Sequence, residues 1–240
     1  MSNLSYMQKA TDRGQLQIHV TTERGFFPIK DASIRLSYTG NPTEIIEELS
    51  TDISGQTAAV ELPAPPLEYS MEPSEFQPYS EYTIQVNASG YRPINISGIS
   101  VLPDKTSIQN VRMETATVEN PLERNIVITA NTLYGNFPPK IPEDEIKPMT
   151  ESGEIVLSRV VIPEYVIVHD GPPSDSSAND YYVRYRDYIK NVASSEIYAT
   201  WPDAALRANI LAIMSFTLNR VYTEWYRNKG YNYTITSSTV

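Results

Sequence analysis

The sequence predicts an α+β multidomain protein, in which an N-terminal antiparallel β-sandwich precedes a smaller α+β domain built on a long buried helix. Two observations lead to this fold class. Short segments of alternating apolar and polar residues fill the chain up to about residue 115, and the stretch from Asp187 to Tyr226 is apolar at helical spacing. The 240 residues suffice for two domains. We expect these at 14–115 and 154–240, joined by residues 116–153.

The sandwich prediction depends on period-two alternation, which places every second side chain on one face of a strand. The alternating apolar residues are Leu16, Ile18 and Val20, then Ile34, Leu36 and Tyr38, then Tyr82, Ile84 and Val86, and the series continues through Ile94, Ile96, Ile99, Val101, Ile108, Val111 and Met113. Turn residues separate these runs, as at Arg24-Gly25, Ser54-Gly55 and Ser89-Gly90. Short strands with regular turns are typical of a β-sandwich.

Residues 116–153 have the composition of a connection. Ile126, Val127 and Ile128 predict one possible strand, and four prolines with alternating charges follow between residues 137 and 149. Such a composition favours an extended, semi-rigid linker. An acidic metal-binding loop is the alternative, but the acidic residues lack a recognisable ligand spacing.

Residues 154–169 return to a β pattern, with two apolar runs broken by Pro163. The loop from Asp170 to Asp180 is rich in Asp, Ser and Pro. Its oxygens could suggest calcium, but their order fits no EF-type loop, so a solvated turn is favoured. We interpret His169 as a histidine at the end of a strand rather than a metal ligand.

Two helices are predicted in the apolar stretch. Tyr188, Ile189 and Val192 recur at helical spacing up to Ser195, and Glu196 stands where this stripe ends. Thr200-Trp201-Pro202-Asp203 predicts the next helix start, with Thr200 as a cap and Asp203 at the positive end of the dipole. From Pro202 to Lys229 apolar residues lie on almost every face, which predicts a buried helix ending at Gly230.

Composition excludes several functional classes. A net charge of −10 argues against a nucleic-acid partner, since binding to phosphates needs clustered Lys and Arg. With no Cys there is no disulfide, thiolate nucleophile or Cys-type zinc site. Two histidines leave little room for a histidine metal cluster or a Ser-His-Asp triad. We expect no cofactor, no metal site and no transmembrane segment, and the first residues have no hydrophobic run typical of a signal peptide.

The N-terminal part resembles the transthyretin-like, carboxypeptidase-regulatory β-sandwich. The resemblance rests on the order of five pieces over about ninety residues. These are Gly25 to Ile29, Ala32 to Leu36, Thr51 to Gly55, Leu62-Pro63, and Tyr82 to Val86 leading to Ala88-Ser89-Gly90-Tyr91. Such modules are usually spacers or binding surfaces.

The later part resembles the SpoIID/LytB domain of sporulating bacteria. The matching residues are Asp187 to Val192, Ser195-Glu196-Ile197, Trp201-Pro202 and Ala205 to Asn209, although Asn209 stands where the family often has Gln. The family acts on peptidoglycan as a lytic transglycosylase. The resemblance implies that Glu196 is the catalytic acid, and we expect Tyr198 and Trp201 to bind substrate. Only about the first eighty residues of such a domain are expected here, so the domain would be incomplete and the chain alone weakly active or inactive.

A lytic transglycosylase can work with a single carboxylate, because the 6-hydroxyl of the sugar attacks in place of water. Glu196 should then start protonated, which requires apolar surroundings, and Ile197, Tyr198 and Trp201 are the candidates for these.

Two functions therefore remain open: a lytic transglycosylase of spore cortex or cell wall, or the front portion of one, and a non-enzymatic structural or glycan-binding protein. In both cases the expected partner is the peptidoglycan glycan strand and the expected location is the spore or cell wall.

Overall fold

The computed structural model describes residues 12–71, 76–117, 122–131, 133 and 159–237. The chain divides into two compact units, Met1–Asn131 and Thr132–Val240. Residues 118–121, 132 and 134–153 of the linker predicted at 116–153, and the first residues of the β region predicted at 154–169, lie outside the described residues.

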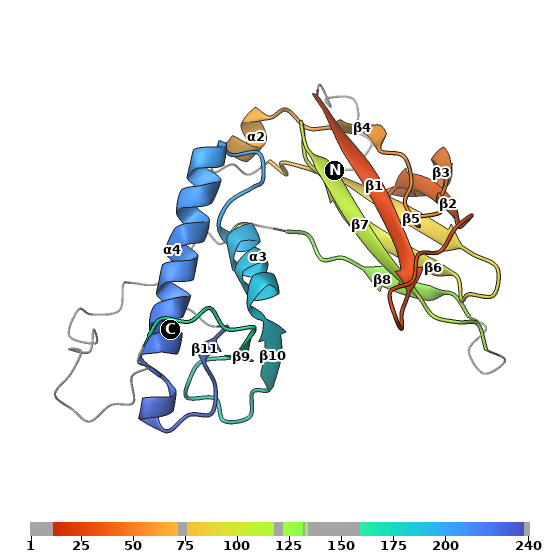
Figure 1. Ribbon diagram of the computed structural model, residues 1–240. Coiled ribbons are helices and arrows are strands. Elements are labelled where there is room, and N and C mark those ends of the chain that lie inside the picture. Colours follow the sequence, from red (N-terminus) through yellow and green to blue (C-terminus); the bar gives the residue numbers. More distant parts are fainter. Residues whose placement is uncertain (1–11, 72–75, 118–121, 132, 134–158, 238–240) are drawn as a thin grey trace. The chain divides into compact units, whose positions relative to one another are not determined.

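The first unit is a β-sandwich whose two sheets share one core. A three-stranded sheet has the order β4-β1-β7 and a five-stranded sheet the order β3-β2-β5-β6-β8 (Figure 1). The strands are β1 (Asp12–Thr22), β2 (Ser33–Tyr38), β3 (Asn41–Ser50), β4 (Val60–Ala64), β5 (Ser80–Asn87), β6 (Ile94–Val101), β7 (Thr106–Met113) and β8 (Arg124–Val127), with the short helix α2 (Glu68–Met71) after β4.

The alternation seen in the sequence is confirmed in this core. Leu16, Ile18 and Val20 of β1 are 0% exposed and pack in one cluster with Ile34 of β2 and Ile84 of β5. The turn at Gly55 also follows the prediction: its φ is +72°, and a Cβ there would collide with the carbonyl oxygen of Val20. Glycine is therefore required where this turn approaches β1.

The sandwich is not purely antiparallel, so that part of the predicted fold class is wrong. β1 pairs with β7 in parallel and β6 pairs with β8 in parallel, while the other pairs are antiparallel. Alternation reports which face of a strand is buried and carries no information on the direction of its neighbour. The connection after β6 crosses to the other sheet, and this crossing places β7 parallel to β1.

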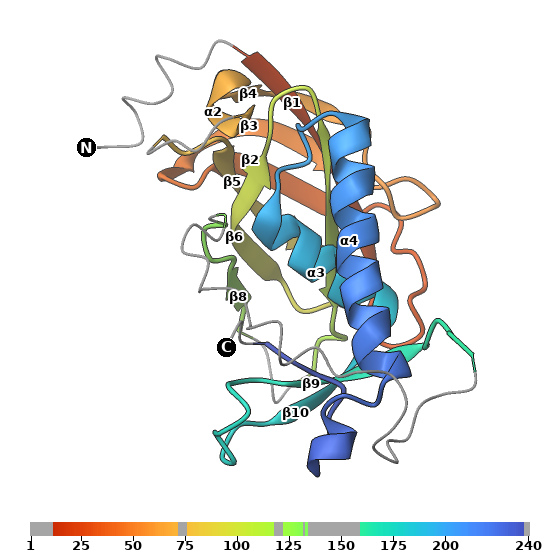
Figure 2. The ribbon, with the colours of Figure 1, turned by 90° about the vertical axis from the view of Figure 1, so that its left-hand side faces the viewer.

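The second unit has α+β structure. Its sheet has the order β10-β9-β11, formed by β9 (Tyr165–His169), β10 (Asp180–Arg184) and β11 (Ile235–Thr236). Its helices are α3 (Tyr185–Glu196), α4 (Asp203–Tyr222) and the 3-10 turn η2 (Arg227–Lys229). α3 and α4 lie alongside one another in both ribbon views (Figures 1 and 2). Val166, Tyr185, Ile189 and Ile213 form the buried centre of this unit.

The long helix differs from its prediction in two ways. It ends at Tyr222 rather than Lys229, since Glu224 adopts a φ of +50° that no helix continues, and Gly230 caps η2 instead. It is also not buried all round: Ile213 is 7% exposed while Leu211 is 62% exposed. Thr200 does not cap it, because the N-cap residue is Pro202 and no side chain makes a capping hydrogen bond.

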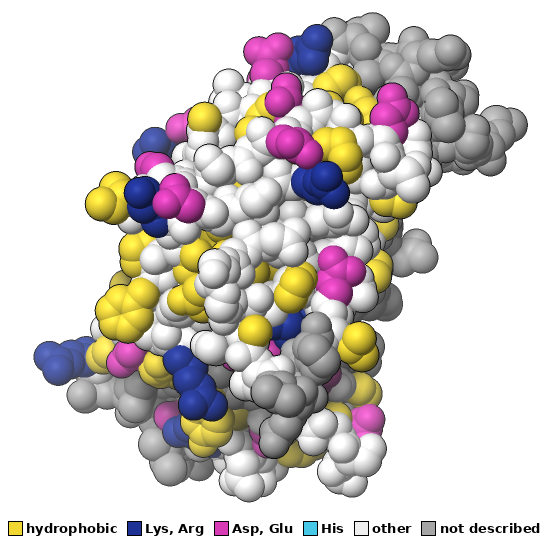
Figure 3. Space-filling model, turned by 90° about the vertical axis from the view of Figure 1, so that its right-hand side faces the viewer, with side chains coloured by type: hydrophobic (Ala, Val, Ile, Leu, Met, Phe, Trp, Pro, Cys, Tyr) yellow, Lys and Arg dark blue, Asp and Glu magenta, His cyan; other side chains and the backbone are white. Residues whose placement is uncertain are grey.

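On the face shown in Figure 3, Lys and Arg side chains lie singly or near acidic ones rather than in one basic patch. Within the described residues no helix is both long and apolar enough to cross a bilayer.

Two truncations on α4 test its sidedness. Ile213→Ala should lower the free energy of unfolding by about 2–5 kcal/mol, because it leaves a cavity in the cluster. Leu211→Ala, two positions earlier on the solvent side, should change it by less than about 0.5 kcal/mol. Urea unfolding followed by circular dichroism measures both. Equal losses would mean that Leu211 is buried as well.

Candidate functional site

The candidate site is the corner between α3 and α4. α3 ends at Glu196, because Ile197 is extended (φ −144°, ψ 152°) and its N–H donates back to Ala193 O at 3.1 Å. The Trp201 N–H then donates to Tyr198 O at 3.2 Å, which closes the turn before Pro202 begins the next helix. The sequence placed Glu196 correctly at the end of its helix.

The antiparallel packing of the two helices brings distant residues together. Three positions on each helix, spaced four residues apart and hence on one helix face, meet across the interface. Tyr188 contacts Thr217 and Glu196 contacts Asn209, while Val192 and Ile213 lie in one apolar cluster. Thr217 is 0% exposed, so this interface is closed at the Tyr188 end. It opens to solvent at the Glu196 end.

Glu196 is held by one contact from the facing helix. Nδ2 of Asn209 donates a hydrogen bond to Oε2 of Glu196 over 2.6 Å. The Glu196 side chain is exposed, which differs from the expected apolar enclosure by Ile197, Tyr198 and Trp201. The difference has a simple origin: Glu196 is the last residue of α3, beyond the apolar stripe that packs on α4.

The two aromatic residues predicted to bind substrate lie in the same corner, and both are half-buried. Burial raises the pKa of the Tyr198 phenol, and a hydrogen bond with the backbone of Leu133 acts in the opposite direction. Burial likewise raises the pKa of Tyr188, and the negative charge of Glu196 adds to this effect. The corner thus combines an exposed carboxylate with partly covered aromatic rings.

Sequence reasoning missed the partner of Glu196. In the sequence Asn209 stands out only as a departure from the family motif, and it lies thirteen residues beyond Glu196. A usable signal existed, since a tight corner between two helices forces antiparallel packing and makes residues near the corner face one another.

A pocket of about 200 Å³ lies in the second unit, away from Glu196. It is at the C-terminal end of α4, and its lining includes Tyr165, Arg220, Glu224, Tyr226 and Tyr233. Within the described residues, no group of three or more His, Asp or Glu side chains could hold a metal ion.

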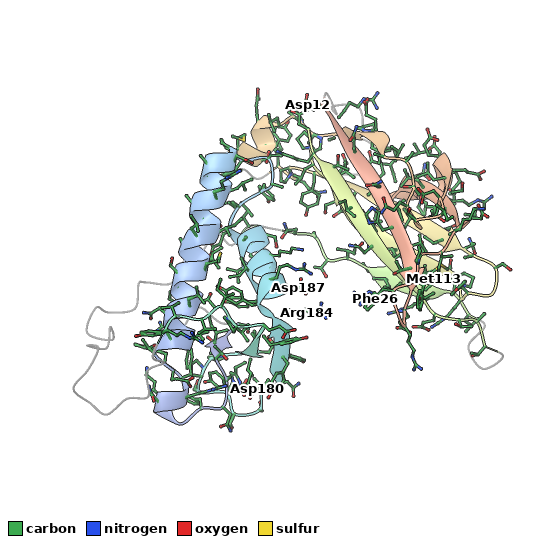
Figure 4. The ribbon with its side chains drawn as sticks, in the orientation of Figure 1. Asp12, Phe26, Met113, Asp180, Arg184 and Asp187 are labelled. Carbon is green, nitrogen blue, oxygen red and sulfur yellow. The ribbon has the colours of Figure 1, made fainter. Side chains whose placement is uncertain are left out.

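His169 is the second titratable centre of this unit. It is 5% exposed, with Nδ1 2.8 Å from Oδ1 of Asp180 and Nε2 3.0 Å from the backbone oxygen of Asp175. Its ring stacks on Tyr233 with centroids 4.4 Å apart. Asp180 opens β10, as Figure 4 shows, so His169 ties the loop between β9 and β10 to both strands. The strand-end position follows the prediction.

This arrangement makes stability depend on pH. The hydrogen bond to Asp180 is the largest cause that raises the pKa of His169 above its usual 6.5. A raised folded-state pKa contributes stability that is complete below about pH 6.5 and is lost as pH rises through the folded-state value. The melting temperature should therefore fall between neutral and alkaline pH. In Asp180→Asn this fall should be smaller, and an unchanged slope in that variant would contradict the role of the pair.

Comparison with known proteins finds low similarity. No family model matches the sequence and no curated protein does, so the SpoIID/LytB resemblance rests on the quoted motifs alone. Among solved structures the chain is similar to the Bacillus anthracis TIE protein (17% identity, TM-score 0.30, covering 44% of this chain and 17% of that one). It is also similar to the minor pilin GBS52 of Streptococcus agalactiae (13% identity, TM-score 0.31, covering 45% and 46%). A third is the Klebsiella pneumoniae 5-hydroxyisourate hydrolase (16% identity, TM-score 0.29, covering 43% and 92%). The matched part thus spans less than half the length of the first two.

Proposed function

We propose that this protein acts on the glycan strands of peptidoglycan in spore cortex or cell wall as a lytic transglycosylase, or is the front portion of one, with Glu196 as its acid and base. The observation that carries the proposal is the Glu196 carboxylate at the exposed end of α3, anchored across the corner by Asn209 at 2.6 Å. It lies within the Ser195-Glu196-Ile197 and Trp201-Pro202 motifs on which the family resemblance rests.

The chemistry needs only one carboxyl group. Protonated Glu196 gives its proton to the glycosidic oxygen as the bond between that oxygen and C1 breaks. The 6-hydroxyl of the same sugar then attacks C1 and returns its proton to the carboxylate. The products are a free hydroxyl end and a 1,6-anhydro end, no water is consumed, and Glu196 regains its proton.

Tyr198 and Trp201 supply the binding surface in this proposal. Aromatic rings have apolar faces that pack on the C–H face of a sugar, and both residues are half-buried, so their positions are fixed at little entropic cost. Their place beside Glu196 in the corner would orient the glycosidic oxygen toward the carboxyl group.

A second candidate function is glycan binding without turnover. The exposure of Glu196 favours it, since a general acid works best where apolar neighbours keep it protonated. In an enzyme, the bound sugar would supply these apolar neighbours and cover Glu196. In a protein that only binds glycan, Glu196 would stay exposed after the glycan binds.

The substitution Glu196→Gln separates the two functions. Gln keeps the shape and can still accept the hydrogen bond from Asn209, but it cannot deliver a proton. Release of 1,6-anhydromuramic ends from purified peptidoglycan, measured by mass spectrometry, should fall by about 10²–10⁴-fold. The melting temperature and the affinity for glycan should stay unchanged.

Glu164→Gln provides the matched control, because Glu164 is an exposed glutamate at the other end of α3. It should leave product release unaffected. Equal activity of wild type and Glu196→Gln would remove Glu196 from catalysis. Glycan binding by a wild-type protein that releases no anhydro ends would favour the second function.

A further inference from the structure

The Asn209 amide contacts Glu196 with one end, and its other end has an unusual environment. Nδ2 of Asn209 donates to Oε2 of Glu196 at 2.6 Å, while Oδ1 of the same amide is buried and receives no hydrogen bond from any described residue. Buried amide oxygens normally accept a hydrogen bond, so a buried amide oxygen without one, next to a titratable carboxyl group, calls for an explanation.

The amide group itself offers one. An Asn side chain has a donor end and an acceptor end, and a half-turn about its last bond exchanges them. A distance of 2.6 Å lies within the range of an O–H···O bond and below that of most N–H···O bonds. The position of Asn209 therefore suits a carboxylate that accepts from Nδ2 and equally a carboxyl O–H that donates to Oδ1.

The helix interface fixes where this exchange can happen. Asn209 shares its face of α4 with Ile213 and Thr217, whose side chains are buried against α3. The backbone of Asn209 is thereby held opposite Glu196, so a half-turn of the amide alone is enough to exchange its two ends. The other charges near Asn209 on α4, Asp203 and Arg207, pair with one another at 3.3 Å. On α3, Tyr188 is the titratable group that senses the charge of Glu196.

We propose that Asn209 is a positioning residue that supports Glu196 in both protonation states, donating through Nδ2 to the carboxylate and accepting through Oδ1 from the carboxylic acid. This inference rests on the proposed function, in which Glu196 alternates between acid and base in every turnover. Asn209 does not touch the sugar. Its hydrogen bond with the carboxylic acid O–H breaks when Glu196 delivers that proton to the glycosidic oxygen, and the hydrogen bond from Nδ2 to the carboxylate then replaces it. It keeps one Glu196 rotamer aimed at the glycosidic oxygen in both halves of the reaction.

Three variants test this role by kinetics on purified peptidoglycan. Asn209→Leu is close in size and removes both ends of the amide, so kcat should fall about tenfold or more while KM changes less than about twofold. Asn209→Asp keeps the shape and adds a like charge, which disfavours the loss of the Glu196 proton, so the alkaline limb of its pH–rate profile should move to higher pH. Asn209→Gln restores the amide and should recover part of the lost kcat. Asn219→Leu, the same change at an exposed position of α4, should behave as wild type.

Nuclear magnetic resonance gives a readout that needs no turnover. The side-chain NH₂ signals of Asn209, assigned by their loss in Asn209→Leu, should move along a single titration curve in the wild type. In Glu196→Gln they should stay still over the same pH range. A purely structural Asn209 would show no selective loss of kcat in Asn209→Leu, even where its signals follow the titration of Glu196.

The outcomes are separable. The proposal would be overturned if the NH₂ signals of Asn209 did not move with pH in the wild type. It would also be overturned if these signals moved with pH but Asn209→Leu kept the wild-type kcat. Coupled signals in a wild-type protein that releases no anhydro ends would refute the proposed function, and with it the catalytic role of Asn209, while leaving the hydrogen bond established.

Discussion

The antiparallel register of α3 against α4 is the constraint on which the candidate site depends. It places Asn209 opposite Glu196 at one end and Tyr188 opposite Thr217 at the other, with Val192 and Ile213 in the apolar cluster between them. Each residue on a helix is rotated about 100° from the next. A slip of one residue would therefore turn Asn209 away from Glu196 and would also expose Thr217, which is 0% exposed. The register that packs the two helices is thus the same register that places Asn209 opposite Glu196.

The composition of α4 hides this sidedness. Its apolar residues lie almost all round, yet Ile213 packs in the cluster while Leu211 and Phe216 face solvent. Arg220 is buried in the same helix, and its guanidinium stacks at 3.9 Å from the ring centroid of Trp225 and 4.9 Å from that of Phe216. A polar residue inside and apolar ones outside cancel the periodic signal. The fold of the neighbouring elements, rather than the helix sequence, decides which face is buried.

The sequence could predict those features that depend on residues close to one another in the chain. Alternation in β1 identified Leu16, Ile18 and Val20 as core residues, and the local motif located Glu196 at its helix end. Both depend on near neighbours in the chain. The parallel pairing of β1 with β7, and the hydrogen bond from Asn209, join residues that only tertiary structure brings together. Neither leaves a periodic pattern. The parallel pairing had no other local signal, whereas the contact of Asn209 could have been inferred only from the tight corner between the two helices.

The two units have separate apolar clusters, and they differ in size. The sandwich core draws residues from both of its sheets, whereas the cluster of the second unit contains, among the described residues, Val166, Tyr185, Ile189 and Ile213. Local opening costs least where few apolar side chains are buried. Among the described residues, the corner that holds Glu196 therefore lies beside the smaller of the two apolar clusters. Small changes at the α3–α4 interface would act directly on the carboxylate, which ties the accuracy of the site to the four side chains of that centre.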